Sequence, residues 1–304
     1  MLILIHFLIV LIFSPLLLGI IGKTKAFFAG RWGAPLLQPY YDIFKLFSKG
    51  NVYSVTTTWI FQAAPLLSFV CILVSCLVLP FGGIHAPCFF WGDVLLFAGL
   101  YTLARFVMVI AALDTGSSFE GMGAAREATF SCLAECCLFL NFIVLALLSK
   151  KLILSQMVGG DLSVSWWTDG PALILVGGSY FMVLLTENAR IPVDDPQTHL
   201  ELTMIHEARV LDHSGWDFAF ILYGSAIKLF VLGGLLVDVL LPLDHQPVLI
   251  QMGEFFVGMV ILAMGIGCVE SSMARLRLNR IPQLLTGSFI LALVGFLVVL
   301  IRGV

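Results

Sequence analysis

Residues 283–301 read QLLTGSFILALVGFLVVLI, a run without one charged side chain. A helix that crosses the hydrocarbon core of a bilayer needs about 20 predominantly apolar residues, so this stretch predicts a transmembrane helix. Seven further apolar segments of similar character precede it, and the ends of all eight are defined to within a few residues. These seven are residues 2–21, 59–80, 93–113, 128–149, 171–187, 218–241 and 252–270.

The composition of the whole chain agrees with this pattern. Of the 304 residues, 60% are hydrophobic and 12% are charged, and this charged share is about half of that in soluble domains. Such a composition excludes a soluble enzyme, a nucleic-acid-binding protein and a disordered chain. The apolar runs are continuous and do not alternate, which disfavours a membrane β-barrel. We therefore expect an all-α integral membrane protein, with about eight transmembrane helices in a single polytopic domain over residues 1–304.

The first and fifth segments differ from the others. The first lacks a basic start and a small-residue cleavage site, so it is interpreted as a retained helix and not as a signal peptide. The fifth is short and leads directly into Glu187, so we expect it to sit low in the bilayer or to be broken.

The placement of Lys and Arg predicts the orientation of the chain. Cytoplasmic loops of membrane proteins are enriched in these residues. Four connections hold eleven of the 16 Lys and Arg residues, against three on the other side. We therefore expect both termini outside and these four connections in the cytoplasm, where their length and polarity also place the function. They are about residues 22–58, 114–127, 188–217 and 271–282.

The stretch 187–217 concentrates ionisable residues, with seven of the 19 acidic residues and three of the six histidines. Clustered carboxylates repel one another, so some of their pKa values rise if the site is desolvated, and histidine titrates near neutral pH. Such a cluster can load, hold and release protons. Alternatively, it is a solvated loop whose charges only keep it out of the bilayer.

Metal binding is a third interpretation of this stretch. His199, His206 and His213 recur every seven residues and would share one face of a helix. No His-Glu-x-x-His motif or matching ligand spacing accompanies them, which disfavours zinc or iron. The seven cysteines form no Cys-x-x-Cys pair, so we interpret them as small membrane-buried side chains.

Several ionisable residues fall inside the apolar segments, where each costs roughly 2.5–3.5 kcal/mol on insertion scales. Such residues persist when they pair with one another or line a water-filled path. For Glu135, Arg105 and Lys228 we favour a functional role over a structural one. Interfacial placement is the simpler interpretation for three others, which are Asp238, Glu254 and Glu270.

Two of the polar connections carry local patterns. In 22–58, the apolar side chains between Tyr40 and Phe47 fall on one helical face. This predicts a short amphipathic surface helix, serving either as a membrane anchor or as a rim on which a soluble partner docks. The glycine-rich connection 114–127 lacks the Gly-Lys-Ser/Thr ending of a phosphate-binding loop. Its glycines, with Arg126 beside Glu127, permit a tight turn and a buried ion pair.

Four motifs occur in a specific order along the chain. They are Arg31-x-Gly33-x-Pro35…Gln38…Asp42-x-x-Lys45-Leu46, Asp114-Thr115-Gly116-Ser117, Gly123-Ala124-Ala125-Arg126-Glu127 and Glu187…Arg190-Ile191-Pro192-Val193-Asp194. Together they resemble the membrane subunit that anchors the peripheral arm in respiratory complex I and its hydrogenase relatives. The resemblance covers nearly the whole chain, including the layout of eight helices.

Two branches of this family are distinguished by further residues. The run from Glu270 to Arg277 resembles the Glu-Asn-Ser-Met-Ala-Arg-Leu-Arg run of formate hydrogenlyase and hydrogenase-4-type subunits. The stretch from Asp194 to Glu207 resembles the energy-converting membrane-bound hydrogenases. Complex I proper usually has Pro-Phe-Asp where this chain has Val193 before Asp194. The hydrogenase branch is therefore favoured.

Membership of that branch implies a non-catalytic membrane subunit in the cytoplasmic (inner) membrane of a bacterium or archaeon. A hydrogenase-like large subunit and an Fe–S small subunit would dock on its cytoplasmic loops, and antiporter-like subunits would lie beside it in the bilayer. Fe–S clusters, and a [NiFe] centre where one is kept, belong to those partners. This chain is expected to hold no cofactor or metal and to bind no nucleic acid.

The resemblance also implies a mechanism of coupling. Electron transfer in the docked arm would change the charge or conformation of the 187–217 loop. That change would pass through buried acids to the pump subunits as proton or sodium translocation, with Lys228 paired to a buried carboxylate. The coupling residues that it implies are Glu127, Glu135, Glu187, Asp194, Glu201, His206, Glu207 and Lys228. The docking residues that it implies are Arg31, Asp42, Lys45, Arg126, Arg190, Arg275 and Arg277.

Two other functions remain open from the sequence. The first is the quinone-site subunit of NADH:quinone oxidoreductase (complex I), which requires a roomy apolar chamber between the first loop and the 187–217 loop. The second is a stand-alone ion transporter, which would use the same buried charges without soluble partners.

Overall fold

The computed structural model describes residues 2–82, 86–158, 160–194, 204–241 and 247–302, and these residues form helices and connections without a strand. Eight of the helices in this part of the chain are long and apolar enough to cross a membrane, which confirms the predicted fold class. The elements are α1 (Leu2–Phe28), α2 (Gln38–Phe47), α3 (Trp59–Ser75), η1 (Cys76–Val78), α4 (Asp93–Asp114), α5 (Ser118–Ser149), α6 (Leu154–Met157), α7 (Gly160–Glu187), η2 (Glu207–Val210), α8 (Gly215–Leu240), α9 (Val248–Ser272), η3 (Leu278–Arg280) and α10 (Ile281–Arg302).

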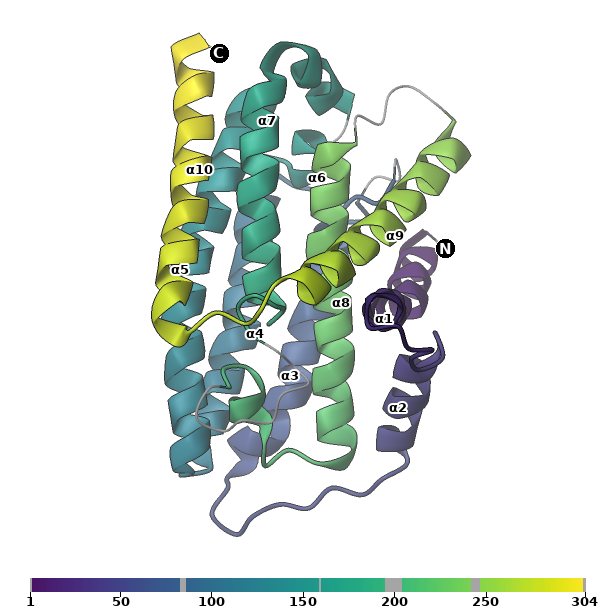
Figure 1. Ribbon diagram of the computed structural model, residues 1–304, viewed down its shortest axis with the longest axis vertical. Coiled ribbons are helices and arrows are strands. Elements are labelled where there is room, and N and C mark those ends of the chain that lie inside the picture. Colours follow the sequence, from purple (N-terminus) through teal and green to yellow (C-terminus); the bar gives the residue numbers. More distant parts are fainter. Residues whose placement is uncertain (1, 83–85, 159, 195–203, 242–246, 303–304) are drawn as a thin grey trace.

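Helix α8 is the centre of the bundle. It packs against α1, α2, α3, α7 and α9, and Figure 1 shows α9 crossing it obliquely. In its most apolar window 67% of the residues are buried, against 28% in α9 and in α10. A helix that is apolar on all sides is stable where protein or lipid surrounds it. Helix α8 therefore has mainly protein neighbours, and α9 and α10 form the outside of the bundle.

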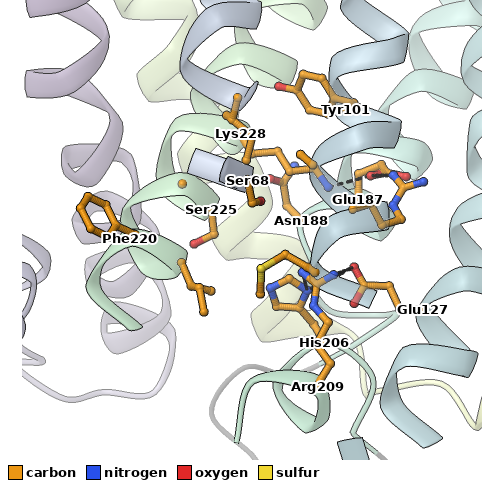
Figure 2. A pocket seen from close by; sticks show the side chains of 16 residues that line it. Ser68, Tyr101, Glu127, Glu187, Asn188, His206, Arg209, Phe220, Ser225 and Lys228 are labelled. Carbon is orange, nitrogen blue, oxygen red and sulfur yellow. Dashed lines mark hydrogen bonds and ion pairs between the residues drawn. The ribbon is translucent and has the colours of Figure 1, made fainter. Parts of the chain in front are cut away.

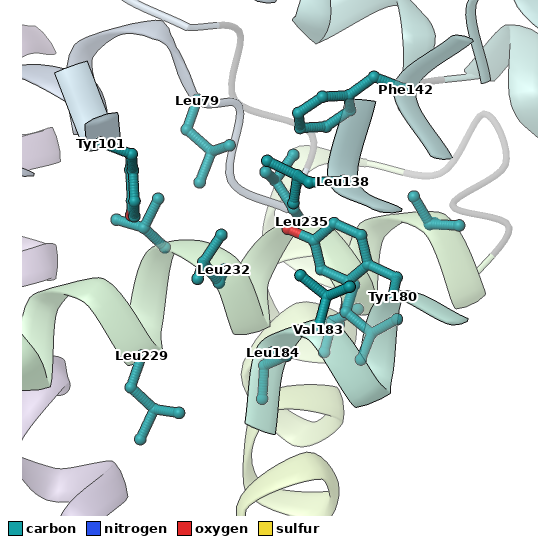
Figure 3. Close-up of a cluster of buried hydrophobic side chains, with 14 of the residues drawn as sticks. Leu79, Tyr101, Leu138, Phe142, Tyr180, Val183, Leu184, Leu229, Leu232 and Leu235 are labelled. Atoms are coloured by element: carbon teal, nitrogen blue, oxygen red, sulfur yellow. The ribbon is translucent and has the colours of Figure 1, made fainter. Parts of the chain in front are cut away.

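The buried core around α8 is made of interlocking aliphatic and aromatic side chains (Figure 3). Leu229, Leu232 and Leu235 of α8 belong to this cluster. Lipid tails are as apolar as leucine, so close packing rather than exclusion from water holds such helices together. Other members of the cluster are Tyr180, Val183 and Leu184 of α7 and Leu138 and Phe142 of α5.

Helix α7 is kinked at Asp169, whose φ and ψ of −120° and 24° are not helical. Pro171 follows two residues later, and proline removes a backbone N–H and clashes with the carbonyl four residues before it. The apolar span of this helix runs only from Asp169 to Glu187. The kink thus lies just before the predicted fifth segment, and residues 171–187 themselves form an unbroken helix.

Several helices begin or end beyond the apolar segments that predict them. Helix α1 continues to Phe28, α5 begins at Ser118, α7 begins at Gly160, and α8 begins at Gly215. Most of the predicted connection 114–127 is therefore helical. Hydropathy misses these turns because their polar side chains, Glu120 and Glu127 among them, are buried against protein and not exposed to lipid.

The predicted amphipathic surface helix is α2, which begins with Pro39 in its first turn, where proline costs no hydrogen bond. Ile43 is buried, and the Tyr40 hydroxyl donates to the Ile12 carbonyl of α1. Phe44 is 72% exposed and Tyr41 is 60% exposed. Some apolar side chains of α2 thus pack against the bundle, and others are exposed on its outer surface.

Candidate functional site

A network of buried charges lies where α4, α5, α7 and α8 meet (Figure 2). Arg105 of α4 is at its centre and forms ion pairs with Glu135 of α5 and, at 2.7 Å, with Glu187 at the end of α7. Lys228 of α8 approaches the same oxygen of Glu187 at 2.7 Å, which confirms the pairing expected for this lysine. The Thr102 hydroxyl also donates to Glu135 at 2.9 Å.

A second group of charges adjoins the first and joins helix α5 to the short helix η2. Glu127 is 8% exposed and forms an ion pair with Arg209 at 2.7 Å. His206 Nδ1 lies 3.6 Å from Glu127 and 3.1 Å from Arg209 Nη2. Figure 2 shows these three side chains gathered on one side of the pocket, with Lys228 on the other.

A cavity of about 50 Å³ lies between the two groups. That volume holds roughly three or four water molecules. A smaller cavity of about 20 Å³ is also lined by Glu127, Glu187 and His206 and reaches Asp194. These three ionisable side chains thus line both cavities. The polar residues that line the larger cavity include Ser68, Tyr101, Asn188, Arg209, Ser225 and Lys228.

Asp194 connects this network to the connection between α7 and α8. Its side chain is buried and accepts the backbone N–H groups of Ile205 at 3.1 Å and His206 at 3.0 Å. Arg275, which precedes α10, forms an ion pair with it at 2.7 Å. Asp194 therefore fixes the backbone position of His206, and it also binds Arg275 in the connection that precedes α10.

The two groups balance in formal charge when His206 is neutral. Breaking a buried ion pair from one side leaves an uncompensated charge and costs about 3–5 kcal/mol. Gain or loss of one proton in the network therefore changes the electrostatic energy of the neighbouring charged side chains. The three cations are Arg105, Arg209 and Lys228, and the three carboxylates are Glu127, Glu135 and Glu187.

Of the remaining predicted coupling residues, Glu207 does not line either cavity. Glu207 begins η2 and is half-buried. Glu201, like His199 of the metal interpretation, lies outside the described residues. Among the described residues, no three His, Cys, Asp or Glu side chains are arranged to hold a metal ion.

The predicted docking residues fall into two sets. Three of them turn inward: Arg126 donates to the Met204 carbonyl at 3.0 Å, Arg190 contacts Glu270 at 3.3 Å, and Arg275 contacts Asp194. The other four are exposed, and these are Arg31, Asp42, Lys45 and Arg277.

Two of the three acids interpreted as interfacial are buried within the bundle. Glu270 is 5% exposed and forms ion pairs with Lys25 of α1 at 3.0 Å and with Arg190. Asp238 is 4% exposed. Glu254, the third, is exposed. Burial against neighbouring helices does not set the depth of a residue in the bilayer, so interfacial placement stays a prediction for all three.

His213, on the connection just before α8, is a buried neutral histidine. Its ring stacks on Phe61 with centroids 4.0 Å apart and planes 3° from parallel. Burial lowers its pKa to about 4, and the positive charge of Arg209 acts in the same direction. The folded chain therefore excludes a proton that the unfolded chain binds below a pH of about 6.5.

This difference predicts that the chain loses stability as the pH falls from about 6.5 to about 4, because the unfolded state binds more protons there. The contribution of His213 is about 3 kcal/mol at most. Thermal unfolding of the purified chain across this range measures it. A His213→Phe variant keeps the stacked ring and should show a shallower dependence. An unchanged slope in that variant would assign the acid sensitivity to other groups.

The fold and this network define an α-helical membrane subunit whose buried ion pairs extend from its connections into the bundle. The family described as NADH dehydrogenase matches residues 1–301. The chain belongs to this family, that of complex I subunit 1.

Individual relatives agree with this assignment. The chain is 29% identical to formate hydrogenlyase subunit 4 of Escherichia coli K12, over 96% of each chain. It is 32% identical to hydrogenase-4 component C of the same organism, over 77% of this chain and 73% of the relative. A subunit of the NADH-quinone oxidoreductase of Rickettsia bellii is 26% identical over 66% of this chain and 58% of the relative.

A solved structure shares the fold. It is a chain of the membrane-bound sulfane sulfur reductase (MBS), an archaeal respiratory membrane complex. The TM-score is 0.81 at 19% identity, and the match covers 98% of this chain and 99% of that one. The arrangement of helices in this chain is therefore shared with a chain of that complex.

Proposed function

We propose that this chain anchors the peripheral arm of a [NiFe]-hydrogenase-type respiratory complex and couples electron transfer in that arm to proton or sodium translocation. The observation that carries the proposal is the balanced network of ion pairs, which extends from Asp194 and His206 into the bundle at Glu135 and Lys228. The two Escherichia coli relatives named above, subunits of a formate hydrogenlyase and of hydrogenase-4, support the hydrogenase branch.

In this proposal a change outside the membrane enters at the connection between α7 and α8. A partner subunit that shifts this connection, or changes the charge beside it, moves the backbone that Asp194 holds. His206 and Arg209 lie on that backbone, so the field at Glu127 changes with them. Coupling then follows from carboxylates whose protonation depends on the charge next to them.

The same network reaches the surface of the chain at Glu135, where a proton or a charge change could pass to an adjacent subunit. The side chain of Glu135 is 24% exposed, more than that of Arg105 or of Glu187, the other acid that Arg105 pairs with. It lies on α5, whose neighbouring residues Cys132 and Cys136 are exposed. We assign to Glu135 the transfer of the signal or of a proton to an adjacent membrane subunit of the antiporter-like kind.

The exposed residues Arg31, Asp42, Lys45 and Arg277 are proposed to contact a hydrogenase-like large subunit and an Fe–S small subunit. Those partners would hold the Fe–S clusters and the [NiFe] centre. The proposal places the chain in a cytoplasmic membrane with both termini outside. Arg126, Arg190 and Arg275 would instead fix the connections that the partners contact.

The quinone-site function finds less support in this cavity. An apolar cavity of about 150 Å³ accepts a benzene ring, and the cavity beside Lys228 measures about 50 Å³. Its lining includes two carboxylates, three cationic side chains and His206. A roomy chamber would have to be completed by the surface of a partner subunit.

Identification of the partners tests the anchoring role. The tagged chain, purified in mild detergent from its own host, should bring down soluble Fe–S subunits with nickel and hydrogen-evolving activity. Fe–S subunits without nickel would favour a quinone or another electron acceptor. A stable chain that purifies alone would contradict the proposal and leave the stand-alone transporter.

Glu135→Gln tests the coupling role. We expect it to reduce ion translocation by roughly 100-fold, the usual scale for losing a proton-transferring group, while the complex still assembles because Arg105 keeps Glu187. Translocation is measured in membrane vesicles with reduced methyl viologen as electron donor. Glu254→Gln, an exposed carboxylate on α9, is the matched control. Normal translocation in Glu135→Gln would make this chain a scaffold only.

A further inference from the structure

A groove lies along α5 near its C-terminal end, beyond the charge network. It has a volume of about 610 Å³, and on α5 it begins at Ile143, about 12 Å along the helix axis from Glu135 at 1.5 Å per residue. The connections before α4 and after α5 form its other walls. Its main lining residues are Trp91, Ile143, Ala146, Leu147, Lys150 and Lys151.

The walls of this groove are fixed to each other by hydrogen bonds. The Gly92 N–H donates to the Leu152 carbonyl at 3.2 Å. The Leu154 N–H donates at 2.7 Å to Asp93, whose side chain is fully buried at the start of α4. Trp91 and Lys151 therefore belong to two segments that these hydrogen bonds hold side by side. The same bonds fix the position of the groove walls.

The groove combines an apolar floor with a basic mouth. Ile143, Leu147 and Lys150 follow one face of α5 at intervals of four and three residues, and Ile143 is 49% exposed. Trp91, 77% exposed, stands at the mouth near Lys150 and Lys151. Tryptophan is enriched at the level of lipid headgroups, and basic pockets at that level bind anionic headgroups.

The charge of the mouth is unusual for its side of the membrane. By the distribution of basic residues, this is the end that carries only three Lys or Arg, and membrane proteins avoid such residues there. Two of the three, Lys150 and Lys151, lie in this one groove. The basic charge on this side of the bundle is therefore concentrated in the groove.

We propose that this groove binds a phospholipid with an anionic headgroup. The phosphate would lie between Lys150 and Lys151, an acyl chain would follow Ile143 and Leu147, and Trp91 would pack beside the glycerol region. The proposal is independent of the coupling role, because no residue of the groove belongs to the charge network.

The test compares lipids retained by the intact complex. After delipidation in detergent, the complex is mixed with vesicles of phosphatidylglycerol or of phosphatidylcholine, and bound lipid is counted by native mass spectrometry. We expect at least fivefold more phosphatidylglycerol than phosphatidylcholine on the unchanged chain. Lys150→Gln with Lys151→Gln should reduce the retained phosphatidylglycerol at least threefold. Lys49→Gln with Arg280→Gln, which removes the same charge from exposed sites outside the groove, should not.

A second measurement reports on the groove directly in the unchanged chain. Phosphatidylglycerol with brominated acyl chains should quench tryptophan fluorescence, and Trp91→Phe should remove part of that quenching. Inorganic phosphate should not displace the lipid, because the acyl chain contributes to binding. Equal retention in the lysine variant and the control, equal retention of the two lipids, or quenching unaltered by Trp91→Phe would each overturn the proposal. The last result would fit a groove covered by a neighbouring protein subunit.

Discussion

Glu187→Gln is expected to abolish ion translocation and to lower the thermal stability of the complex. Glu187 is the shared partner of Arg105 and Lys228, each at 2.7 Å. Arg105 keeps Glu135 when Glu187 is neutralised, but Lys228 loses its counter-charge inside the bundle. An uncompensated buried charge costs about 3–5 kcal/mol. Thermal unfolding of the purified complex and translocation by vesicles measure the two effects separately.

A double variant distinguishes coupling from simple stabilisation. Glu187→Gln with Lys228→Met removes one negative and one positive charge, so the balance of the network is restored. Neutral replacement of a buried ion pair often leaves stability unchanged or improved. We expect the double variant to regain the thermal stability of the natural chain and still fail to translocate ions. Recovery of translocation would show that the pair serves only the fold.

The membrane fold is predictable from the sequence because lipid imposes a simple rule. Each helix that crosses the bilayer needs about 20 predominantly apolar residues. Helix α10 is recognised from the uncharged run 283–301 alone. The rule fails where a polar helical turn is surrounded by protein, as at Glu120 and Glu127, because hydropathy does not separate a buried polar side chain from a solvated one. Hydropathy therefore predicts a loop where α5 has its first turns.

The charge network is only partly visible in the sequence. An ionisable residue inside an apolar segment has to pair or meet water, so the pairing of Lys228 and of Arg105 is predictable from their positions. The choice of partner depends on helix packing, and Arg105 and Glu187 lie 82 residues apart in the sequence. The sequence does not identify Arg209 as the partner of Glu127, although its position three residues after His206 places both on one side of η2.

Gly123 and Gly121 allow a matched test of the contact between α5 and η2. A Cβ at Gly123 would lie 2.8 Å from the Ala208 Cβ and 2.9 Å from the backbone nitrogen of Arg209. A Cβ at Gly121 would meet nothing within 4 Å. Both residues are within α5, so the two Gly→Ala changes differ only in what the added methyl group meets.

Gly123→Ala is expected to destabilise the complex by about 1–3 kcal/mol, the usual cost of overpacking. Because the contact is with the backbone of η2, relief requires η2 to move, and Arg209 moves away from Glu127. Translocation should fall with stability. Gly121→Ala should instead stabilise α5 by up to about 1 kcal/mol, since alanine is the better helix former. Equal behaviour of the two variants, in thermal unfolding and in translocation, would show that η2 shifts without cost and that the Glu127–Arg209 contact is dispensable for coupling.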